Sequence, residues 1–170
     1  LVRHNSYLFK GNVEENLRMA KPDATKEEME AVLQKVNLLG FLQTQNGLQT
    51  ELLEKAGNLS GGQCQRLVIA RALLRSDSAV YIFDEAASNI DVESEELIMN
   101  VIHELAKTKT VLLISHRLAN VVQSDQIYFL KNGTICERGT HAELMEQNGA
   151  YRHLYDSQMV LENYGKQGNA

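Results

Sequence analysis

The chain has 170 residues, of which 44% are hydrophobic and 23% are charged, which suits one compact domain and is too short for two ordinary ones. Its formal net charge is −5 with both signs interspersed, which argues against the basic surface of a nucleic-acid-binding protein. The cysteines, Cys64 and Cys136, have no CxxC spacing or histidine companion, so neither a metal site nor a disulfide framework is expected, and no apolar run approaches the roughly 20 residues of a membrane-spanning helix.

The first part of the chain, from about residue 11 to 57, is predicted to be helical and rather polar. Lys26 to Val36 carries apolar side chains at helical spacing. Turn and N-cap chemistry just before this run is supplied by Pro22, Asp23 and Thr25. Asn37 to Thr44 is predicted to form a second, shorter helix.

A serine and two glycines then begin the most distinctive segment, Leu59-Ser60-Gly61-Gly62-Gln63, which leads into a helix. Ser60 can cap this helix, and the glycines leave backbone N–H groups uncovered at the positive end of its dipole. Such a helix start is an anion site suited to a phosphate. An ordinary serine-capped helix explains the same residues without a ligand, and is the simpler interpretation of this segment alone.

The middle of the chain is predicted to form a βαβ unit. Ala79 to Phe83 and Thr110 to Ser115 are short apolar runs rich in β-forming residues, which is typical of strands buried on both faces of a parallel sheet. Between them, Leu97 to Leu105 presents one apolar helical face.

The last part of the chain is predicted to hold a hairpin followed by helix. Gln126 to Leu130 and Thr134 to Glu137 are joined by a tight turn at Lys131-Asn-Gly133. Helix is expected from Thr140 to about Tyr155. The final residues, Asn163 to Ala170, are polar and are expected to fray.

Two acids, Asp84 and Glu85, follow the first predicted strand of the βαβ unit. They should lie at the carboxyl edge of the sheet, where open α/β sheets bind ligands. Adjacent carboxylates repel unless a cation, a water or a substrate stabilises them. In phosphoryl-transfer sites the first acid holds Mg²⁺, usually through water, and the second polarises the attacking water. A strand followed by a solvated acidic turn fits these residues too.

His116 follows the second predicted strand of the same unit. Because neighbouring parallel strands end on the same side, His116 is expected near Asp84 and Glu85, where it could hydrogen-bond a γ-phosphate. The other four of the five histidines are interpreted as structural or merely exposed.

Together these segments resemble the ATPase domain of ABC transporters. Leu59 to Gln63 matches the family's LSGGQ signature, and Val80 to Glu85 resembles its Walker B strand followed by the catalytic glutamate. Ser88-Asn-Ile-Asp91 resembles the D-loop, and His116 stands where the switch histidine stands. The resemblance extends from residue 2 to about residue 158.

The resemblance implies a role for each matching residue. Asp84 would support Mg²⁺ coordination through water, and Glu85 would be the general base for ATP hydrolysis. His116 would contact the γ-phosphate, and Asp91 would help to join the two halves of a dimer. The γ-phosphate of ATP held by the other subunit would be bound by Ser60, Gly61, Gly62 and Gln63.

The implied fold is α/β, a partial P-loop NTPase fold with a mostly parallel sheet, flanking helices and an α-helical signature subdomain. Residues 1–158 would be the C-terminal portion of the ATPase domain. Within them, about 10–75 would form the helical subdomain with the signature helix and 76–158 the RecA-like part. Residues 159–170 would be a polar tail.

Two departures from the family pattern stand out. No GxxxxGK[ST] occurs in the chain, so the loop that cradles phosphates is expected upstream of Leu1, and this fragment is expected to be inactive alone. The family's V-x-Q-x-x-x-L-F stretch is matched by Val2, Leu8 and Phe9, with His4 at the glutamine position. Histidine can still bind a water or a phosphate, with a charge that varies near neutral pH.

Two segments are similar to ABC exporters in particular, Leu8 to Leu17 and Arg138 to Leu144. The resemblance implies an ATPase that powers export at the cytoplasmic face of the cell membrane, using ATP and Mg²⁺. Its partners would be a second ABC ATPase domain, paired head to tail as a homo- or heterodimer, and the transmembrane domain of the same transporter. His4 to Gly11 is similar to the bacterial cysteine/glutathione exporters.

Two other classes remain open. One is a soluble ABC ATPase acting on nucleic acid or ribosomes, against which the acidic balance and the exporter-like segments argue. The other is a non-catalytic binding or regulatory module, against which Glu85 argues. No nucleic-acid partner is expected.

Overall fold

The structure is a computed structural model that describes residues 1–167, with the side chains of residues 1–161. It contains two compact units, Leu1–Ile114 and Ser115–Ala170. The expected boundary near residue 75, between the helical subdomain and the RecA-like part, stays a prediction. The signature helix and the strands that follow it fall in the same unit.

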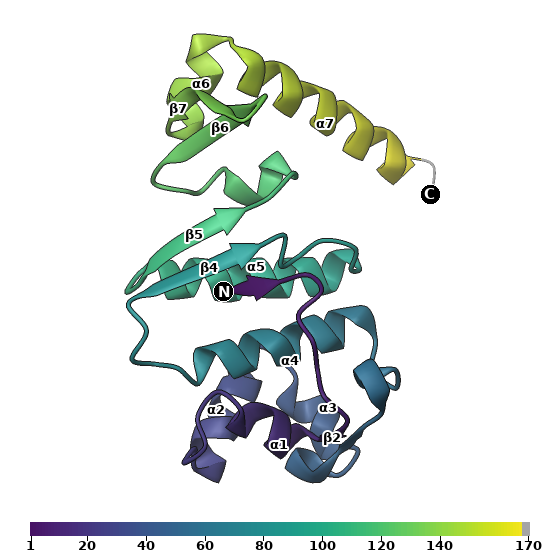
Figure 1. Cartoon of the computed structure of the whole chain (residues 1–170). Coiled ribbons are helices and arrows are strands. Elements are labelled where there is room, and N and C mark those ends of the chain that lie inside the picture. The colour runs from purple at the N-terminus through teal and green to yellow at the C-terminus, as the bar shows by residue number, and fades with distance from the viewer. Residues whose placement is uncertain (168–170) are drawn as a thin grey trace. The chain divides into compact units, whose positions relative to one another are not determined.

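The first unit contains short strands and several helices (Figure 1). Its strands are β1 (Val2–Arg3), β2 (Gly11–Asn12), β3 (Glu51–Leu52), β4 (Val80–Asp84) and β5 (Thr110–Ile114). Its helices are α1 (Val13–Arg18), α2 (Lys26–Lys35), α3 (Leu39–Gln43), α4 (Gly61–Leu73) and α5 (Val92–Ala106), with 3₁₀ turns at Gly47–Gln49 and Glu54–Ala56. The helices predicted over 26–36 and 37–44 are confirmed as α2 and α3.

The first unit contains a parallel sheet of order β1-β4-β5. Arg3 pairs with Asp84, and Asp84 with Ile114, so the three strands end at one common edge. The predicted βαβ unit is confirmed as β4-α5-β5. A separate antiparallel pair joins β2 to β3.

Burial of β4 and β5 on both faces was expected, and this prediction is wrong. Along β4, Tyr81 and Phe83 are buried, whereas Val80 is 55% exposed. On β5, Leu112 is 49% and Ile114 46% exposed. Side chains alternate between the faces of a sheet, and the register puts these three exposed residues on one face. One face packs into the core, and the described residues leave the other partly open.

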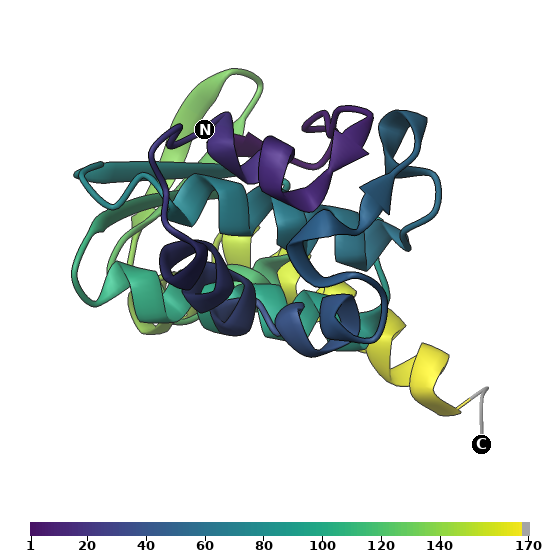
Figure 2. The ribbon, with the colours of Figure 1, turned by 90° about the horizontal axis from the view of Figure 1, so that it is seen from below.

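Helix α4 is the centre of the helical layer. It lies between the sheet and α1–α3 (Figure 1), and the view from below shows α1–α3 in front of it (Figure 2). Four consecutive residues of α4 are buried, Leu67 to Ala70. A helix is buried all round only when it is covered on several sides, and here the sheet and the other helices cover it together.

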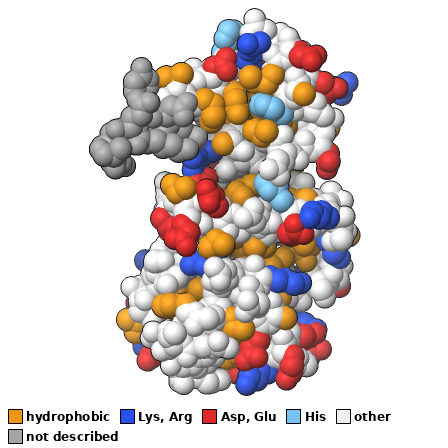
Figure 3. All heavy atoms as spheres, turned by 180° about the vertical axis from the view of Figure 1, so that it is seen from behind, with side chains coloured by type: hydrophobic (Ala, Val, Ile, Leu, Met, Phe, Trp, Pro, Cys, Tyr) orange, Lys and Arg blue, Asp and Glu red, His pale blue; other side chains and the backbone are white. Residues whose placement is uncertain are grey.

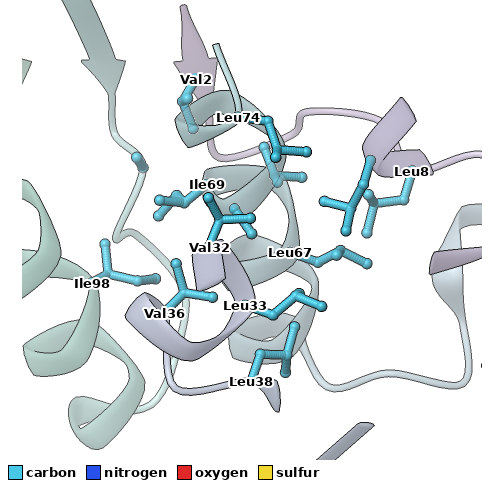
Figure 4. Packing of buried hydrophobic residues seen from close by; sticks show 14 of the residues in the cluster. Val2, Leu8, Val32, Leu33, Val36, Leu38, Leu67, Ile69, Leu74 and Ile98 are labelled. Carbon is cyan, nitrogen blue, oxygen red and sulfur yellow. The ribbon is translucent and has the colours of Figure 1, made fainter. Parts of the chain in front are cut away.

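The hydrophobic core gathers side chains from α2, α4 and α5, with residues of the N-terminal segment (Figure 4). Leu33 of α2, Leu67 of α4 and Ile98 of α5 are almost fully buried. Val2 and Leu8 extend this core to β1 and the loop after it. The packing therefore fixes α4 relative to both the sheet and the other helices.

Side-chain caps begin several of the described helices. Capping boxes, in which the N-cap and the third helical residue satisfy each other's backbone N–H, begin four helices. The N-caps are Asn12 for α1, Thr25 for α2, Ser60 for α4 and Thr140 for α6 (His141–Gln147). The predicted caps at Thr25 and Ser60 are confirmed.

The second unit holds the predicted hairpin and two helices. Strands β6 (Ile127–Lys131) and β7 (Thr134–Gly139) pair antiparallel after a 3₁₀ turn at Leu118–Val121. Asn132 and Gly133 have φ values of 53° and 77°, the two left-handed residues that a tight hairpin turn needs.

Helix α7 (Ala150–Gln167) is longer than expected. The sequence predicts helix to about Tyr155 and fraying from Asn163, but α7 continues to Gln167, while residues 168–170 lie outside the described residues. The Glu137 carboxylate of β7 accepts hydrogen bonds from the first two backbone N–H groups of α7, at 2.6 and 3.1 Å. None of the described helices combines the length and apolarity needed to cross a bilayer.

Candidate functional site

The carboxyl edge of the parallel sheet collects three of the predicted site residues. Asp84 ends β4 opposite Arg3, the last residue of β1. Glu85 and His4 are the next residues along these two strands. The structure therefore places His4, Asp84 and Glu85 at one edge, where ligands bind in open α/β sheets.

Asp84 is half-buried and forms an ion pair that the sequence does not predict. Its Oδ2 lies 3.6 Å from Nε of Arg3, and 38% of the Asp84 side chain is exposed. An ion pair with this much solvent contact contributes little stability. It nevertheless puts a guanidinium beside the carboxylate that is predicted to support Mg²⁺.

Glu85 has a strained backbone. Its φ is +51°, a left-handed conformation that costs a residue other than glycine about 1–3 kcal/mol and that clusters at functional sites. Its N–H donates to the Ile114 carbonyl at 2.9 Å, and its carbonyl accepts from the N–H and the hydroxyl of Ser88. The neighbouring strand and the D-loop together hold this conformation.

The signature start is exposed at Ser60 and is organised as a capping box. The Ser60 hydroxyl accepts from the Gln63 N–H at 3.2 Å, and Gln63 Oε1 accepts from the Ser60 N–H at 2.9 Å. These two N–H groups are satisfied within the chain. The described residues offer no acceptor to the N–H groups of Gly61 and Gly62, which are the donors left for an anion.

Asp91 is the N-cap of α5. Its Oδ1 accepts from the Ser94 N–H at 2.8 Å. Hydrogen bonds from the backbone N–H and the hydroxyl of Ser94 lower the pKa of the Asp91 carboxyl, with a smaller contribution from the Arg66 charge. The role of Asp91 in joining two ATPase domains stays a prediction.

The signature start, the D-loop and the sheet edge are linked within the first unit. Nε2 of Gln65, two residues beyond the signature, donates to the Arg3 carbonyl at 3.3 Å. Gly61 lies beside the D-loop residue Ile90, and Gly62 beside Ser94. Sequence reasoning missed Gln65, Arg3 and Ser94, because only the strand register and the contact between α4 and α5 reveal them.

His116 belongs to the second unit, two residues beyond the end of β5. Gln158 of α7 holds this segment: its Nε2 donates to the His116 carbonyl at 2.8 Å, and its Oε1 accepts from the Leu118 N–H at 2.9 Å. The expected approach of the His116 side chain to Asp84 and Glu85 stays a prediction.

A complete metal site is not formed by the described residues, in which no three His, Cys, Asp or Glu side chains are arranged to hold an ion. Asp84 offers a carboxylate, an oxygen ligand of the kind that Mg²⁺ prefers, and its role towards Mg²⁺ stays a prediction. Further ligands would have to come from the nucleotide, from water or from other parts of the protein.

Comparisons with known proteins show the family to which the chain belongs. The family model described as ABC transporter matches residues 1–88, just over half of the 170 residues. An "Uncharacterized ABC transporter ATP-binding protein" of Haemophilus influenzae is 52% identical over 170 residues, which are 100% of this chain and 30% of that protein. An "ATP-dependent lipid A-core flippase" of Vibrio vulnificus is 43% identical over 157 residues, 91% of this chain and 27% of that protein.

Among solved structures, that of a bacterial Atm1-family ABC exporter with ATP bound superposes with a TM-score of 0.83 at 29% identity, covering 92% of this chain and 28% of that one. The chain thus spans less than a third of the length of these relatives. The sheet edge, the signature helix and the family match lead to one conclusion: the chain belongs to the ABC transporter family.

Proposed function

We propose that this chain supplies the hydrolytic edge and the signature loop of an ATPase that powers export across a membrane. The observation that carries this proposal is the convergence at one sheet edge of His4, Asp84 and Glu85, joined to the signature helix by the Gln65–Arg3 hydrogen bond. The relatives named as a lipid A-core flippase and as an ABC exporter support export as the coupled process.

Each residue then has a chemical role. Glu85, held at a fixed backbone angle, would accept a proton from the attacking water. Asp84 would support Mg²⁺, which supplies charge neutralisation at the phosphates when it is bound. His4 would hydrogen-bond water or phosphate at the same edge, and His116 the γ-phosphate.

The signature loop would serve a second ATPase domain. The N–H groups of Gly61 and Gly62, at the positive end of α4, suit a γ-phosphate presented from outside. Ser60 and Gln63 hold that helix start in shape, and Asp91 would contribute to the contact between the two domains. The partners proposed are that second domain and a transmembrane domain, at the cytoplasmic face of the membrane.

Nucleic acid is not a proposed partner. Acidic and basic side chains are interspersed on the face shown in Figure 3, without an extended basic surface. Binding to a phosphate backbone depends on such a surface. The charge distribution therefore favours the exporter over an ABC ATPase that acts on nucleic acid.

The Glu85→Gln substitution in the complete protein tests the general base. Because general base catalysis contributes about 10²–10⁴-fold, we expect phosphate release from ATP to fall at least about 100-fold. ATP binding, measured with a fluorescent analogue, should persist, since the amide keeps the size of the carboxylate.

Glu93→Gln, on the exposed side of the α5 start, is the matched control and should leave turnover unchanged. The isolated 170-residue chain should show no Mg²⁺-dependent turnover in the same assay. Full activity of the Glu85→Gln protein would contradict the proposed role of Glu85.

A further inference from the structure

The two signature glycines differ in what surrounds them. A Cβ on Gly62 would collide with the Ser94 hydroxyl, and would lie 2.6 Å from the Ser94 Cβ and 3.1 Å from Oδ2 of Asp91. A Cβ on Gly61 would meet nothing closer than the Ile90 Cγ2, at 3.8 Å. Of the two signature glycines, therefore, Gly62 is the one at which packing within the chain leaves no room for a Cβ.

Ser94 cannot move away from Gly62 easily. Rotation about χ1 would take its hydroxyl elsewhere, but its Cβ is fixed by the backbone of α5. That backbone is held by the Asp91 cap at Ser94 and by the buried side chains of Ile98 and Ile102. We call Gly62, Asp91 and Ser94 the Gly62 junction.

Arg66 holds the Gly62 side of the junction in place. Its Nε donates to the Gly62 carbonyl at 3.3 Å, and another guanidinium nitrogen donates to the Asn37 carbonyl at 2.9 Å. The first turn of α4 is thereby tied to the loop between α2 and α3. It cannot shift without breaking these hydrogen bonds or moving α5.

We propose that Ser94 is a positioning residue: through the Gly62 junction it fixes the start of α4, which carries the proposed phosphate donors, against the D-loop residue Asp91. This inference rests on the proposed function. The N–H donors proposed for phosphate lie on α4, and Asp91, proposed for the contact between domains, begins α5.

A double substitution in the complete protein tests the junction. Gly62→Ala should lower kcat/KM for ATP hydrolysis at least about tenfold, because overpacking displaces a helix start. Gly62→Ala combined with Ser94→Gly should recover most of this loss, because both colliding atoms are removed. Gly62→Ala with Ser94→Ala should recover less, because the Cβ remains. Single Ser94 variants provide the baselines.

Gly61→Ala is the matched comparison, since Gly61 does not face Ser94: adding Ser94→Gly should leave its defect unchanged. If Ser94 positions the helix start, then in assays well below the melting temperature Ser94→Gly should reverse the effects of Gly62→Ala on both KM for ATP and kcat. Rescue of the melting temperature alone would reduce Ser94 to a structural role and overturn the proposal, as would a double variant as impaired as Gly62→Ala.

These results are separable from the proposed function. A complete wild-type protein that does not hydrolyse ATP would refute the proposed function. The junction would then be tested by measuring nucleotide affinity and melting temperature. Gly62→Ala should lower both, and adding Ser94→Gly should restore both. Failure of this restoration would refute the junction.

Discussion

Asp91 illustrates, at the scale of a residue, how one carboxylate stabilises a helix start. Its folded-state pKa lies below the ordinary value of 3.8, chiefly because the Ser94 backbone N–H donates to the ionised form. A lowered folded-state pKa means that the stabilisation is present above pH 3.8 and is lost as pH falls through the folded-state value.

Asp91→Asn should therefore remove part of the acid sensitivity of the chain. Asparagine is as good an N-cap as aspartate but does not titrate, so we expect little change in unfolding free energy at pH 7 and a shallower loss as pH falls below the ordinary aspartate pKa of 3.8. Urea unfolding followed by circular dichroism measures both. If Asp91→Asn lost as much unfolding free energy in acid as the wild-type chain, the assignment would be contradicted.

Residues that belong to a contiguous motif could be predicted, and those that act across the fold could not. Ser60, Asp84 and Glu85 stand where a helix start or a strand end is visible in the sequence. Arg3 reaches Asp84 only because β1 and β4 pair in a particular register. Ser94 matters only because α5 packs on Gly62, and one sequence contains no signal for such a contact.

At the scale of elements, the periodicity of apolar residues predicted the positions of strands and helices in the sequence. It predicted their burial less well. The run that became β5 is apolar throughout, yet all its residues keep some exposure. The apolar composition of a strand indicates that its side chains favour burial. Whether they are buried depends on which other elements pack against the strand. Helix α4 shows the opposite case, because the sheet and the other helices leave almost none of its middle exposed.

Leu67→Ala should be strongly destabilising for this reason. Leu67 has no exposed surface, and truncating a fully buried leucine removes its burial and leaves a cavity, which costs about 2–5 kcal/mol. Chemical denaturation gives the difference in unfolding free energy. Leu53→Ala removes the same atoms from a side chain that is 50% exposed and should cost much less; equal effects would show that α4 is not central to stability.

At the scale of the whole molecule, the most consequential feature is the partly exposed face of the parallel sheet. Val80, Leu112 and Ile114 lie on one face of the parallel sheet and are exposed. Contiguous apolar surface of this kind promotes association.

The isolated chain should accordingly self-associate, and Leu112→Lys should reduce the association by placing a charge in the middle of the face. Light scattering across a concentration series measures the average mass. Val92→Lys adds the same charge at an exposed valine of α5, away from this face, and should have little effect. A wild-type chain that stays monomeric at high concentration would contradict the prediction.

The left-handed backbone at Glu85 sets the stability of the folded chain against its proposed catalytic activity. Glycine or asparagine would adopt that angle with less strain, but neither could take a proton from water. Selection for a more heat-resistant protein would therefore favour replacing the very residue on which turnover is proposed to depend. Only selection for turnover itself would keep the glutamate.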